Sequence, residues 1–500
     1  MKFTPHPYQQ TALEFLIRRS TMEENKGAGL FLDPGLGKTA IVLLWLRLLI
    51  RLGIAKKVLI VAPLRVVYSV WPKEIQKWDQ FRHLRISIVH GSPTKRMKAI
   101  STPADIYLTT AQSLPAVWEA FSVRGVEDIP WDTLIVDEST LFKSWGGNRR
   151  KKKATEDDEE PRSRRLSRSM ALRKMLPAFQ RRVILTGTPR AEGLQDLFAQ
   201  VFIVDKGESL GTSKSKFLTR YFYRGGFGGY QYFPHQTAER LIREKISPFC
   251  LSMSAEDHLD MPELITNDVW IDLPPGAAKQ YRDMEKKMFL ELTNGEELSP
   301  LNAGGRYLAC RQIAAGGLYD VEDKEIVHHL HDSKVDAVED LVNELNGKPA
   351  LIAFQFKHDL DRLRKRWPKL PSIDGRTTGK AADKLVDQWN AGDLKMLAVQ
   401  PKSLSHGINM QSGPGRDLIF VGLDDSLETY LQLVARLYRQ GVTGQVRVHR
   451  VLATDTVDEM IRERIDRKDQ SQRSFLEDFG RFDMEAWKEA GNRVQWSPRR

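Results

Sequence analysis

The seven residues that directly follow the first apolar segment have the composition of a loop that binds phosphate. They read DPGLGKT at positions 33–39. Gly35 and Gly37 let the backbone turn its N–H groups toward a phosphate, and the N-terminus of the helical pattern that follows adds partial positive charge. In this pattern Lys38 reaches the β- and γ-phosphates of a nucleotide, and Thr39 places its hydroxyl on Mg²⁺. The alternative is a plain surface turn. It is the weaker interpretation, because an apolar strand precedes the loop and a helix follows it.

Two adjacent carboxylates follow a second apolar strand about a hundred residues downstream, in the sequence LIVDE at 134–138. A parallel strand that ends in acids delivers them to the carboxyl edge of its sheet, where a phosphate loop also lies. There Asp137 would hold Mg²⁺, and Glu138 would orient and deprotonate an attacking water. An Asp-Glu pair alone could equally be an exposed strand end, but together with Lys38 it indicates nucleotide hydrolysis.

Four further stretches decide the class of protein. They are PYQ at 7–9, TGTP at 186–189, PKSLSHGINMQ at 401–411 and QLVARLYRQ at 432–440. With these motifs the sequence resembles helicase superfamily two and, within it, the Swi/Snf-type double-stranded-DNA translocase ATPases, in a short form like those of bacteria and their phages. The resemblance runs from about Pro5 to about Lys468, nearly the whole chain.

The resemblance implies a role for each motif residue, with ATP and magnesium as cofactors. Adenine is read by Gln9, the nucleotide and Mg²⁺ are bound by Gly35, Gly37, Lys38, Thr39 and Asp137, and water is activated by Glu138. Coupling of hydrolysis to lobe movement is carried by Thr186, Gly187, Thr188, Gly407, Asn409 and Gln432. The γ-phosphate is approached from the second lobe by two arginine fingers, Arg436 and Arg439. The segments at 62–63, 71–78 and 109–110 occupy places where the family touches the DNA backbone.

Some positions depart from these patterns. Leu32 stands where the phosphate-loop pattern has its first glycine, and Ser139 and Thr140 follow the carboxylates where many relatives keep a histidine as the fourth residue of the motif. The two arginines have a physical argument of their own. They are three residues apart, so on a helix Arg436 and Arg439 share a face, and a planar guanidinium suits phosphate oxygens.

The elements that must position these residues predict an α/β fold with two RecA-like parallel-sheet lobes and an accessory helical region between them. Ten apolar strands are expected, at 30–33, 58–62, 86–90, 105–109, 134–137, 183–186, 350–354, 396–399, 418–421 and 446–452. The expected domains are a first lobe at 1–192, a helical region and linker at 193–330, a second lobe at 331–460 and a helical tail at 461–500.

Composition limits the alternatives. The 500 residues carry a formal net charge of +11, with 41% hydrophobic and 28% charged residues and two cysteines. This is ordinary globular usage, too poor in cysteine for a disulfide framework, and we expect no membrane segment, no signal peptide and a cytoplasmic location in a bacterium or a phage-infected host. The positive charge favours a polyanionic partner, with nucleic acid first.

Three segments have two interpretations each. The basic stretch 149–174 reads as an exposed insertion within the first lobe, with a DNA-contacting arm as the alternative. The aromatic stretch 221–233 reads as a glycine-rich hairpin packed under its own aromatic residues, with base stacking as the alternative. The triplet His328, His329 and His331 reads as a helix-end or surface cluster rather than a metal site.

The sequence therefore predicts an ATP-dependent translocase or helicase that moves on double-stranded DNA without sequence specificity. The nearest alternative is a strand-separating helicase acting on DNA or RNA at a replication fork, which shares every motif above. The more distant alternative is a non-catalytic clamp on nucleic acid that ATP gates, against which the water-activating Glu138 argues.

Overall fold

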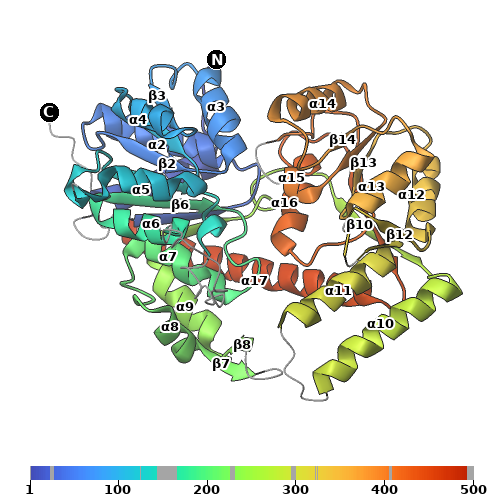
Figure 1. Ribbon diagram of the computed structural model, residues 1–500. Helices are drawn as coiled ribbons and strands as arrows, with labels where there is room; N and C mark the ends of the chain where they lie inside the picture. The colour runs from blue at the N-terminus through green and yellow to red at the C-terminus, as the bar shows by residue number, and fades with distance from the viewer. Residues whose placement is uncertain are drawn as a thin grey trace. The chain divides into compact units, whose positions relative to one another are not determined.

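The computed structural model of the chain describes residues 2–22, 27–123, 125–143, 166–225, 231–293, 300–320, 322–323, 325–404 and 408–491. The chain divides into two compact units, Met1–Leu259 with Ser471–Arg500, and Asp260–Gln470. Each unit is built around its own parallel sheet (Figure 1).

The sheet of the first unit has seven parallel strands in the order β3-β4-β2-β5-β6-β1-β9. They are β1 (Gly27–Leu32), β2 (Val58–Val61), β3 (Ile86–Val89), β4 (Ile106–Thr109), β5 (Thr133–Asp137), β6 (Arg181–Thr186) and β9 (Cys250–Met253). All six strands predicted for this part of the chain are confirmed. The seventh, β9, was not predicted.

Helices enclose this sheet. They are α1 (Pro7–Thr21), α2 (Lys38–Arg51), α3 (Trp71–Lys77), α4 (Pro93–Ser101), α5 (Leu114–Ser122), α6 (Arg168–Met175), α7 (Leu197–Asp205), α8 (Lys214–Tyr221) and α9 (Ala238–Ile246). Successive strand residues enter two different apolar cores: Leu134 and Val136 of β5 belong to one, and Ile135 belongs to the other. Both faces of the sheet are therefore buried, which explains why its strands are continuous apolar runs.

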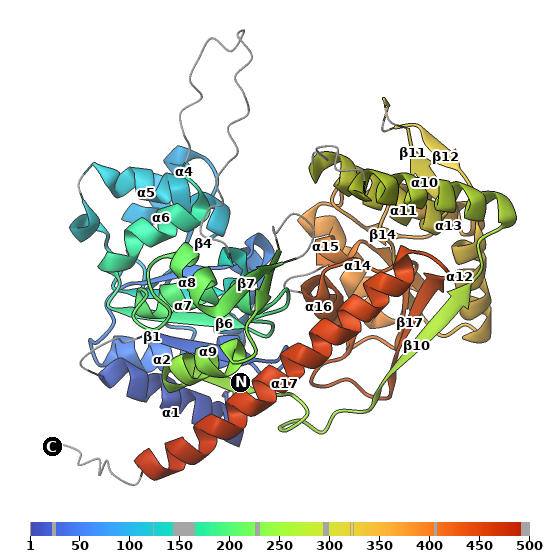
Figure 2. The same cartoon turned by 90° about the horizontal axis from the view of Figure 1, so that it is seen from below.

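The sheet of the second unit has six parallel strands in the order β10-β17-β16-β13-β15-β14. They are β10 (Leu264–Ile271), β13 (Ala350–Ala353), β14 (Ser372–Ile373), β15 (Met396–Val399), β16 (Asp417–Phe420) and β17 (Val446–Ala453). The four predicted strands are confirmed. The outer strand β10 was not predicted, and Figure 2 shows it beside β17.

Helices and a small hairpin complete the second unit. The helices are α10 (Pro275–Thr293), α11 (Pro300–Ala315), α12 (Ser333–Glu344), α13 (Lys357–Arg366), α14 (Gly379–Ala391), α15 (Pro401–Leu404), α16 (Leu427–Leu437) and α17 (Val457–Gly491), whose residues from Ser471 belong to the first unit. The hairpin consists of β11 (Gly317–Tyr319) and β12 (Val327–His329). None of the helices in the described parts of the chain is long and apolar enough to cross a membrane.

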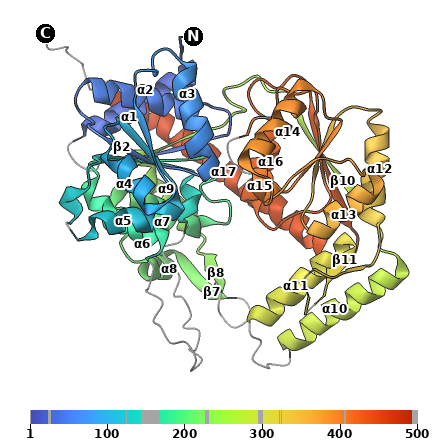
Figure 3. The ribbon, with the colours of Figure 1, turned by 45° about the horizontal axis from the view of Figure 1, so that its top comes forward.

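The region 193–330, predicted to be helical, contains helices α7 to α11 and also supplies strand β9 to one sheet and β10 to the other. It holds a second hairpin of β7 (Phe222–Gly225) and β8 (Gln231–Pro234), which follows α8 (Figure 3). The two units divide this region after Leu259. The domain limits given above stay a prediction. Of the basic stretch, residues 149–165 lie outside the described residues, and α6 begins soon after them.

Candidate nucleotide-binding site

Three neighbouring strands of the first sheet end at residues that the sequence analysis singled out. Strands β5, β6 and β1 are adjacent and parallel, with Asp137 paired to Leu185 and Thr186 paired to Phe31. Because the carboxyl ends of parallel strands lie at one edge of a sheet, three segments meet there. They are the glycine-rich loop after β1, the carboxylates after β5 and the residues after β6.

The glycine-rich loop turns in the way that its sequence predicts. Gly35 and Gly37 have φ angles of 99° and 78°, which residues with a side chain rarely adopt. Gln9 lies against this loop: its Nε2 donates to the carbonyl of Leu36 at 3.1 Å, while its Oε1 accepts from the backbone of His6 at 2.9 Å. A Cβ at Gly37 would lie 2.5 Å from Gln9 Nε2. The structure therefore brings Gln9 and Gly37 together.

Lys38 and Thr39 open helix α2 directly after this turn. The Lys38 ammonium donates to the carbonyl of Leu32 at 2.7 Å and to that of Asp33 at 3.3 Å, so it is held over the loop. The Asp33 carboxylate accepts from the backbone of Ala255 at 3.0 Å, and burial raises its pKa. A cationic ammonium and a hydroxyl thus lie at the start of a helix, an arrangement that suits phosphate.

The carboxylates occupy contrasting environments. Asp137 is buried, and its Oδ2 accepts from the indole Nε1 of Trp71 at 3.0 Å. Burial, reinforced by the neighbouring charge of Glu138, raises the pKa of Asp137 to about 6. Glu138 is only partly buried and has a φ of 59°, an uncommon conformation for a non-glycine residue. The two adjacent carboxylates therefore differ in exposure at the end of β5.

The segment after β6 contacts both neighbours. The Thr186 hydroxyl lies 3.5 Å from Glu138 Oε2 and also accepts from the backbone of Thr188 at 3.1 Å. A Cβ at Gly187 would lie 3.0 Å from Cδ of Pro34 in the glycine-rich loop. The three strand-end segments are therefore packed against one another.

These residues fit a magnesium nucleotide. Mg²⁺ binds oxygen ligands and usually keeps waters and substrate phosphates beside one or two protein ligands, which Asp137 and Thr39 would supply here. Burial raises the pKa of the Asp137 carboxylate, and a bound cation would favour the charged form of this group.

In the second unit, α16 and the segment around Asn409 are joined by hydrogen bonds. The Arg436 guanidinium donates to the carbonyls of Gln432 and Ile408, both at 3.0 Å. The Arg439 guanidinium donates to Oδ1 of Asn409. The structure thus brings four of the predicted residues of this unit into one group, with Gln432 providing a backbone oxygen. Gly407 lies outside the described residues.

The prediction that the two arginines share a helical face is wrong. Arg436 lies in the last turn of α16, which ends at Leu437, and Tyr438 has extended backbone angles. Arg439 follows in a turn before Gly441, whose φ is 88°. The helix ends two residues before Arg439, so the shared face, which required both arginines to be helical, does not form.

The segments predicted to touch the DNA backbone contain both buried and exposed side chains. Trp71, Thr109 and Thr110 are all buried, and Thr109 Oγ1 donates to a backbone carbonyl within the sheet. Exposed side chains in the same part of the unit include Tyr68 and Lys77. The segment 71–78 therefore includes exposed side chains such as Lys77, although Trp71 itself is buried.

The histidine triplet divides into exposed and buried members. His328 and His329 are exposed, and each lies 3.1 Å from an aspartate. His331 is buried, its Nε2 lies 2.9 Å from the carbonyl of Ile313, and burial lowers its pKa. The prediction of a helix-end or surface cluster is therefore wrong for His331 only as to the surface, because His331 lies two residues before α12 and packs inside the second unit.

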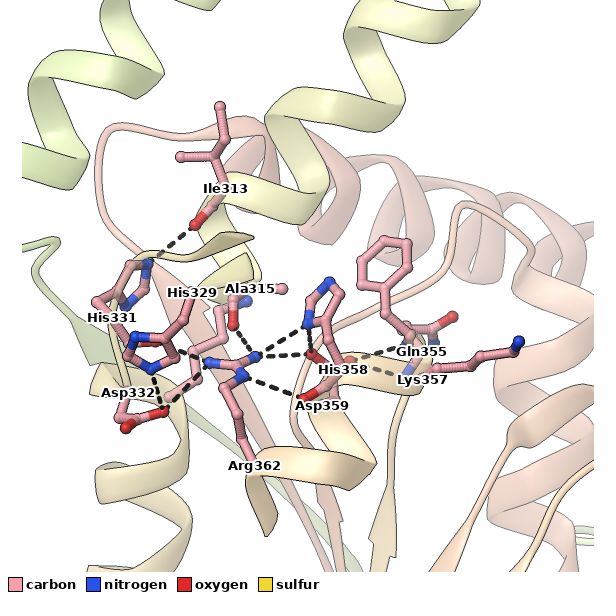
Figure 4. Close-up of polar contacts among 12 residues, drawn as sticks. Ile313, Ala315, His329, His331, Asp332, Gln355, Lys357, His358, Asp359 and Arg362 are labelled. Carbon is pink, nitrogen blue, oxygen red and sulfur yellow. Dashed lines mark hydrogen bonds and ion pairs between the residues drawn. The ribbon is translucent and has the colours of Figure 1, made fainter. Parts of the chain in front are cut away.

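A buried arginine explains the position of His331 (Figure 4). The Arg362 guanidinium donates to the carbonyl of His331 at 2.8 Å, to the carbonyl of Ala315 and to the Asp359 carboxylate at 2.9 Å. It thereby ties the end of α11 to the chain before α12 and to α13. We assign this network to the architecture of the second unit.

The aromatic stretch forms the predicted hairpin. Tyr221 and Phe222 are buried, whereas Tyr223 and Phe233 are exposed and lie opposite each other on β7 and β8, with ring centroids 5.7 Å apart. Residues 226–230 lie outside the described residues. The aromatic side chains therefore pack both under and upon the hairpin.

Two residues at the site were missed as participants by the sequence analysis. Trp71 was placed in a DNA-facing segment, yet it binds Asp137. Gln200 was not singled out at all, yet its side chain binds Ser139 beside the carboxylates. An isolated polar residue within an apolar helix was the available signal for Gln200.

The fold and this site define an α/β nucleotide-binding protein of two RecA-like lobes. The chain belongs to the SNF2-related family: the SNF2-related domain matches residues 8–304, and the helicase conserved C-terminal domain matches residues 333–441. The predicted Swi/Snf-type resemblance and the fold class are thereby confirmed.

The relatives differ in length. Protein p41 of Acyrthosiphon pisum secondary endosymbiont phage 1 is 36% identical over 491 residues, covering 95% of this chain and 98% of that protein. The DNA excision repair protein ERCC-6-like of Bos taurus is 24% identical, and the CHD3-type chromatin-remodeling factor PICKLE of Arabidopsis thaliana is 23% identical. The matches cover 91% of this chain in both cases, but only 40% and 33% of those proteins. The Sulfolobus solfataricus SWI2/SNF2 ATPase core in complex with dsDNA matches with 20% identity and a TM-score of 0.43, over 100% of this chain and 98% of that one.

Proposed function

We propose that this protein is an ATP-dependent translocase on double-stranded DNA, with ATP and Mg²⁺ as cofactors. The observation that carries the proposal is the meeting of three segments at one sheet edge, where Lys38, Asp137 and Thr186 end or follow adjacent strands. Membership of the SNF2-related family supports ATP hydrolysis as its chemistry.

Within the first unit, each residue is proposed to have a separate role. Gln9, held against the loop, would read the adenine, and Lys38 would leave its carbonyl partners for the phosphates. Thr39 and Asp137 would hold Mg²⁺, which when bound neutralises phosphate charge. Glu138, whose carboxylate lies near the Thr186 hydroxyl, would accept the proton of the attacking water.

The second unit is proposed to complete hydrolysis. Arg436 and Arg439 would stabilise the charge that develops on the γ-phosphate, as arginine fingers do in related NTPases. The bond from Arg439 to Asn409 supports this role, because it fixes the guanidinium on the segment that the family uses near its cleft. Gly407 and Gln432 would take part in coupling from the same region, as Thr186, Gly187 and Thr188 would in the first unit.

Duplex DNA is proposed as the track. The net charge of +11 would supply sequence-independent attraction to phosphates, and the family relatives include proteins named for DNA repair and chromatin remodelling. The phage origin of the relative p41 supports action in the cytoplasm of a bacterium or phage-infected host.

The test compares ATP hydrolysis with duplex DNA, single-stranded DNA and RNA in parallel. We expect duplex DNA to stimulate turnover most, and Glu138→Gln to abolish turnover while ATP still binds. Glu119→Gln, which changes an exposed carboxylate of the same unit, is the matched control and should hydrolyse ATP normally. Normal turnover by Glu138→Gln would refute the assigned role.

The alternatives give different results in the same experiments. A strand-separating helicase would displace one strand of a forked duplex and would be stimulated by single strands or RNA. An ATP-gated clamp would bind nucleic acid in response to ATP without steady turnover by the wild-type protein.

A further inference from the structure

A buried side-chain contact connects the carboxylate segment to a helix that carries none of the motifs. Ser139, the residue after Glu138, donates from Oγ to Oε1 of Gln200 at 2.6 Å. Nε2 of Gln200 donates in turn to the carbonyl of Pro189 at 2.7 Å and to that of Asp196 at 2.9 Å. Both Ser139 and Gln200 are fully buried.

The orientation of the Gln200 amide is determined by its partners. A primary amide has two N–H donors, and here both face backbone carbonyls, which cannot donate. Reversing the amide would place its oxygen against two carbonyl oxygens. The bond to Ser139 therefore depends on the position of Pro189, and a shift of one partner strains the bond to the other.

The surroundings of Gln200 make this contact unusual for a core position. The helix α7 is buried along its length, and Gln200 is the polar residue in the run LFAQVFIV at 197–204. An apolar side chain would fill this position without the cost of burying an amide. Burying an amide is costly unless every polar atom is paired. The contact therefore specifies geometry as well as filling space.

A second connection joins the same two strand-end segments. The Thr186 hydroxyl lies 3.5 Å from Glu138 Oε2 and accepts from the backbone of Thr188. One connection thus runs from Glu138 to Thr186, and the other runs from Ser139 through Gln200 to Pro189. Together with the backbone, these contacts form a closed ring that passes through Glu138, the proposed water-activating residue, and we call this ring the circuit.

We propose that Gln200 is a positioning residue that makes the segment after β5 and the segment after β6 move together during the ATPase cycle. This inference rests on the proposed function. It names the device that passes a change at Glu138 to residues 186–190, at a place where the sequence has Ser139 and Thr140 instead of the histidine found in many relatives.

The first test measures ATP turnover and the KM for ATP in Gln200→Met, Ser139→Ala and the double variant. Ser20→Ala is the matched control, because Ser20 is also buried and its hydroxyl accepts from the indole of Trp45 at 2.8 Å. Each circuit variant should lower kcat about tenfold, the effect of about one hydrogen bond on a rate, with the KM for ATP unchanged. Because the two residues act as one unit, the double variant should be no slower than Gln200→Met.

Two results would overturn the role of Gln200. One is a kcat equal to that of Ser20→Ala in both single variants, and the other is a double variant whose losses multiply. Thermal unfolding of all four proteins separates these outcomes from failure to fold.

A second measurement does not depend on hydrolysis. Amide hydrogen exchange is followed with and without a non-hydrolysable ATP analogue and Mg²⁺. In the wild-type protein the analogue should change exchange in segments 138–142 and 186–190, and in Gln200→Met the change at 186–190 should be lost while that at 138–142 remains. An equal change at both segments in the variant overturns the inference.

The proposed function can fail separately. If the wild-type protein binds the analogue and shows the linked exchange but never hydrolyses ATP, the translocase proposal fails and the positioning role stands. If the wild-type protein shows no response to nucleotide, both fail.

Discussion

Replacing Gly37 with alanine tests whether Gln9 and the glycine-rich loop act together. Two features of Gly37 disfavour an alanine here: the backbone has a φ of 78°, and an added Cβ would lie 2.5 Å from Gln9 Nε2. Gly53 provides a matched control in the same unit, because it has a φ of 67° and no atom within 4 Å of its Cβ position. The pair separates backbone strain from displacement of Gln9.

The expected changes in the free energy of unfolding follow from these two features. An alanine in the left-handed region costs about 1–2 kcal/mol, and this cost applies at both positions. Gly37→Ala must also push Gln9 away from the loop and break its bond to Leu36, which adds about 1 kcal/mol. We therefore expect Gly37→Ala to lower the free energy of unfolding by about 2–3 kcal/mol and Gly53→Ala by about 1–2 kcal/mol.

The assay joins urea unfolding with steady-state kinetics for ATP and GTP. Gly37→Ala should raise the KM for ATP about tenfold and remove the preference for ATP over GTP, because the displaced amide no longer reads the base. Gly53→Ala should keep wild-type values of both. A Gln9→Ala variant, which leaves the backbone unstrained, should reproduce the loss of preference.

The reasoning is refuted if Gly37→Ala and Gly53→Ala have the same KM and the same ATP preference. It is also refuted if Gln9→Ala discriminates between ATP and GTP as the wild-type protein does.

Three further predictions concern the charged residues. Arg439→Ala should bind ATP with little change but lose ~10³-fold or more in kcat, which nucleotide binding and single-turnover hydrolysis measure, and unchanged turnover would remove Arg439 from the mechanism. In metal-free buffer, the pKa of Asp137 is about 6 in the folded protein and 3.8 in an ordinary aspartate. The stability that protonation of this group contributes is therefore complete below pH 3.8 and is lost as the pH rises through 6. Asp137→Asn should therefore become more stable than the wild-type protein by up to about 3 kcal/mol above pH 6 in urea unfolding, and a constant difference between pH 4 and pH 7 would contradict this. Duplex affinity measured by fluorescence anisotropy should fall steeply and linearly on a log–log plot against salt in both the wild-type protein and Lys38→Ala, and an affinity independent of salt would argue against phosphate contacts.

The sequence was most informative where strands are buried on both faces. Such strands are continuous apolar runs, and all ten predicted ones are present. Among the strands that were not predicted, β9 is fully buried but short, and it reads CLSM. The edge strand β10 reads LITNDVWI and is only partly buried, while β14 has two residues.

For the site, local motifs predicted that the glycine-rich loop and the strand-end carboxylates would lie at one sheet edge, and the structure places them there. Contacts formed only by the tertiary fold left no such pattern, as Gln200 and Trp71 illustrate: their partners lie 61 and 66 residues away in the chain.

Displacement of a triplex-forming strand from blunt duplex DNA tests the translocase proposal most directly. The wild-type protein with ATP and Mg²⁺ should displace the third strand, while Glu138→Gln should bind the same DNA and leave the third strand in place. Steady hydrolysis of ATP by the wild-type protein on this duplex without any displacement would contradict the proposal that hydrolysis drives movement along DNA.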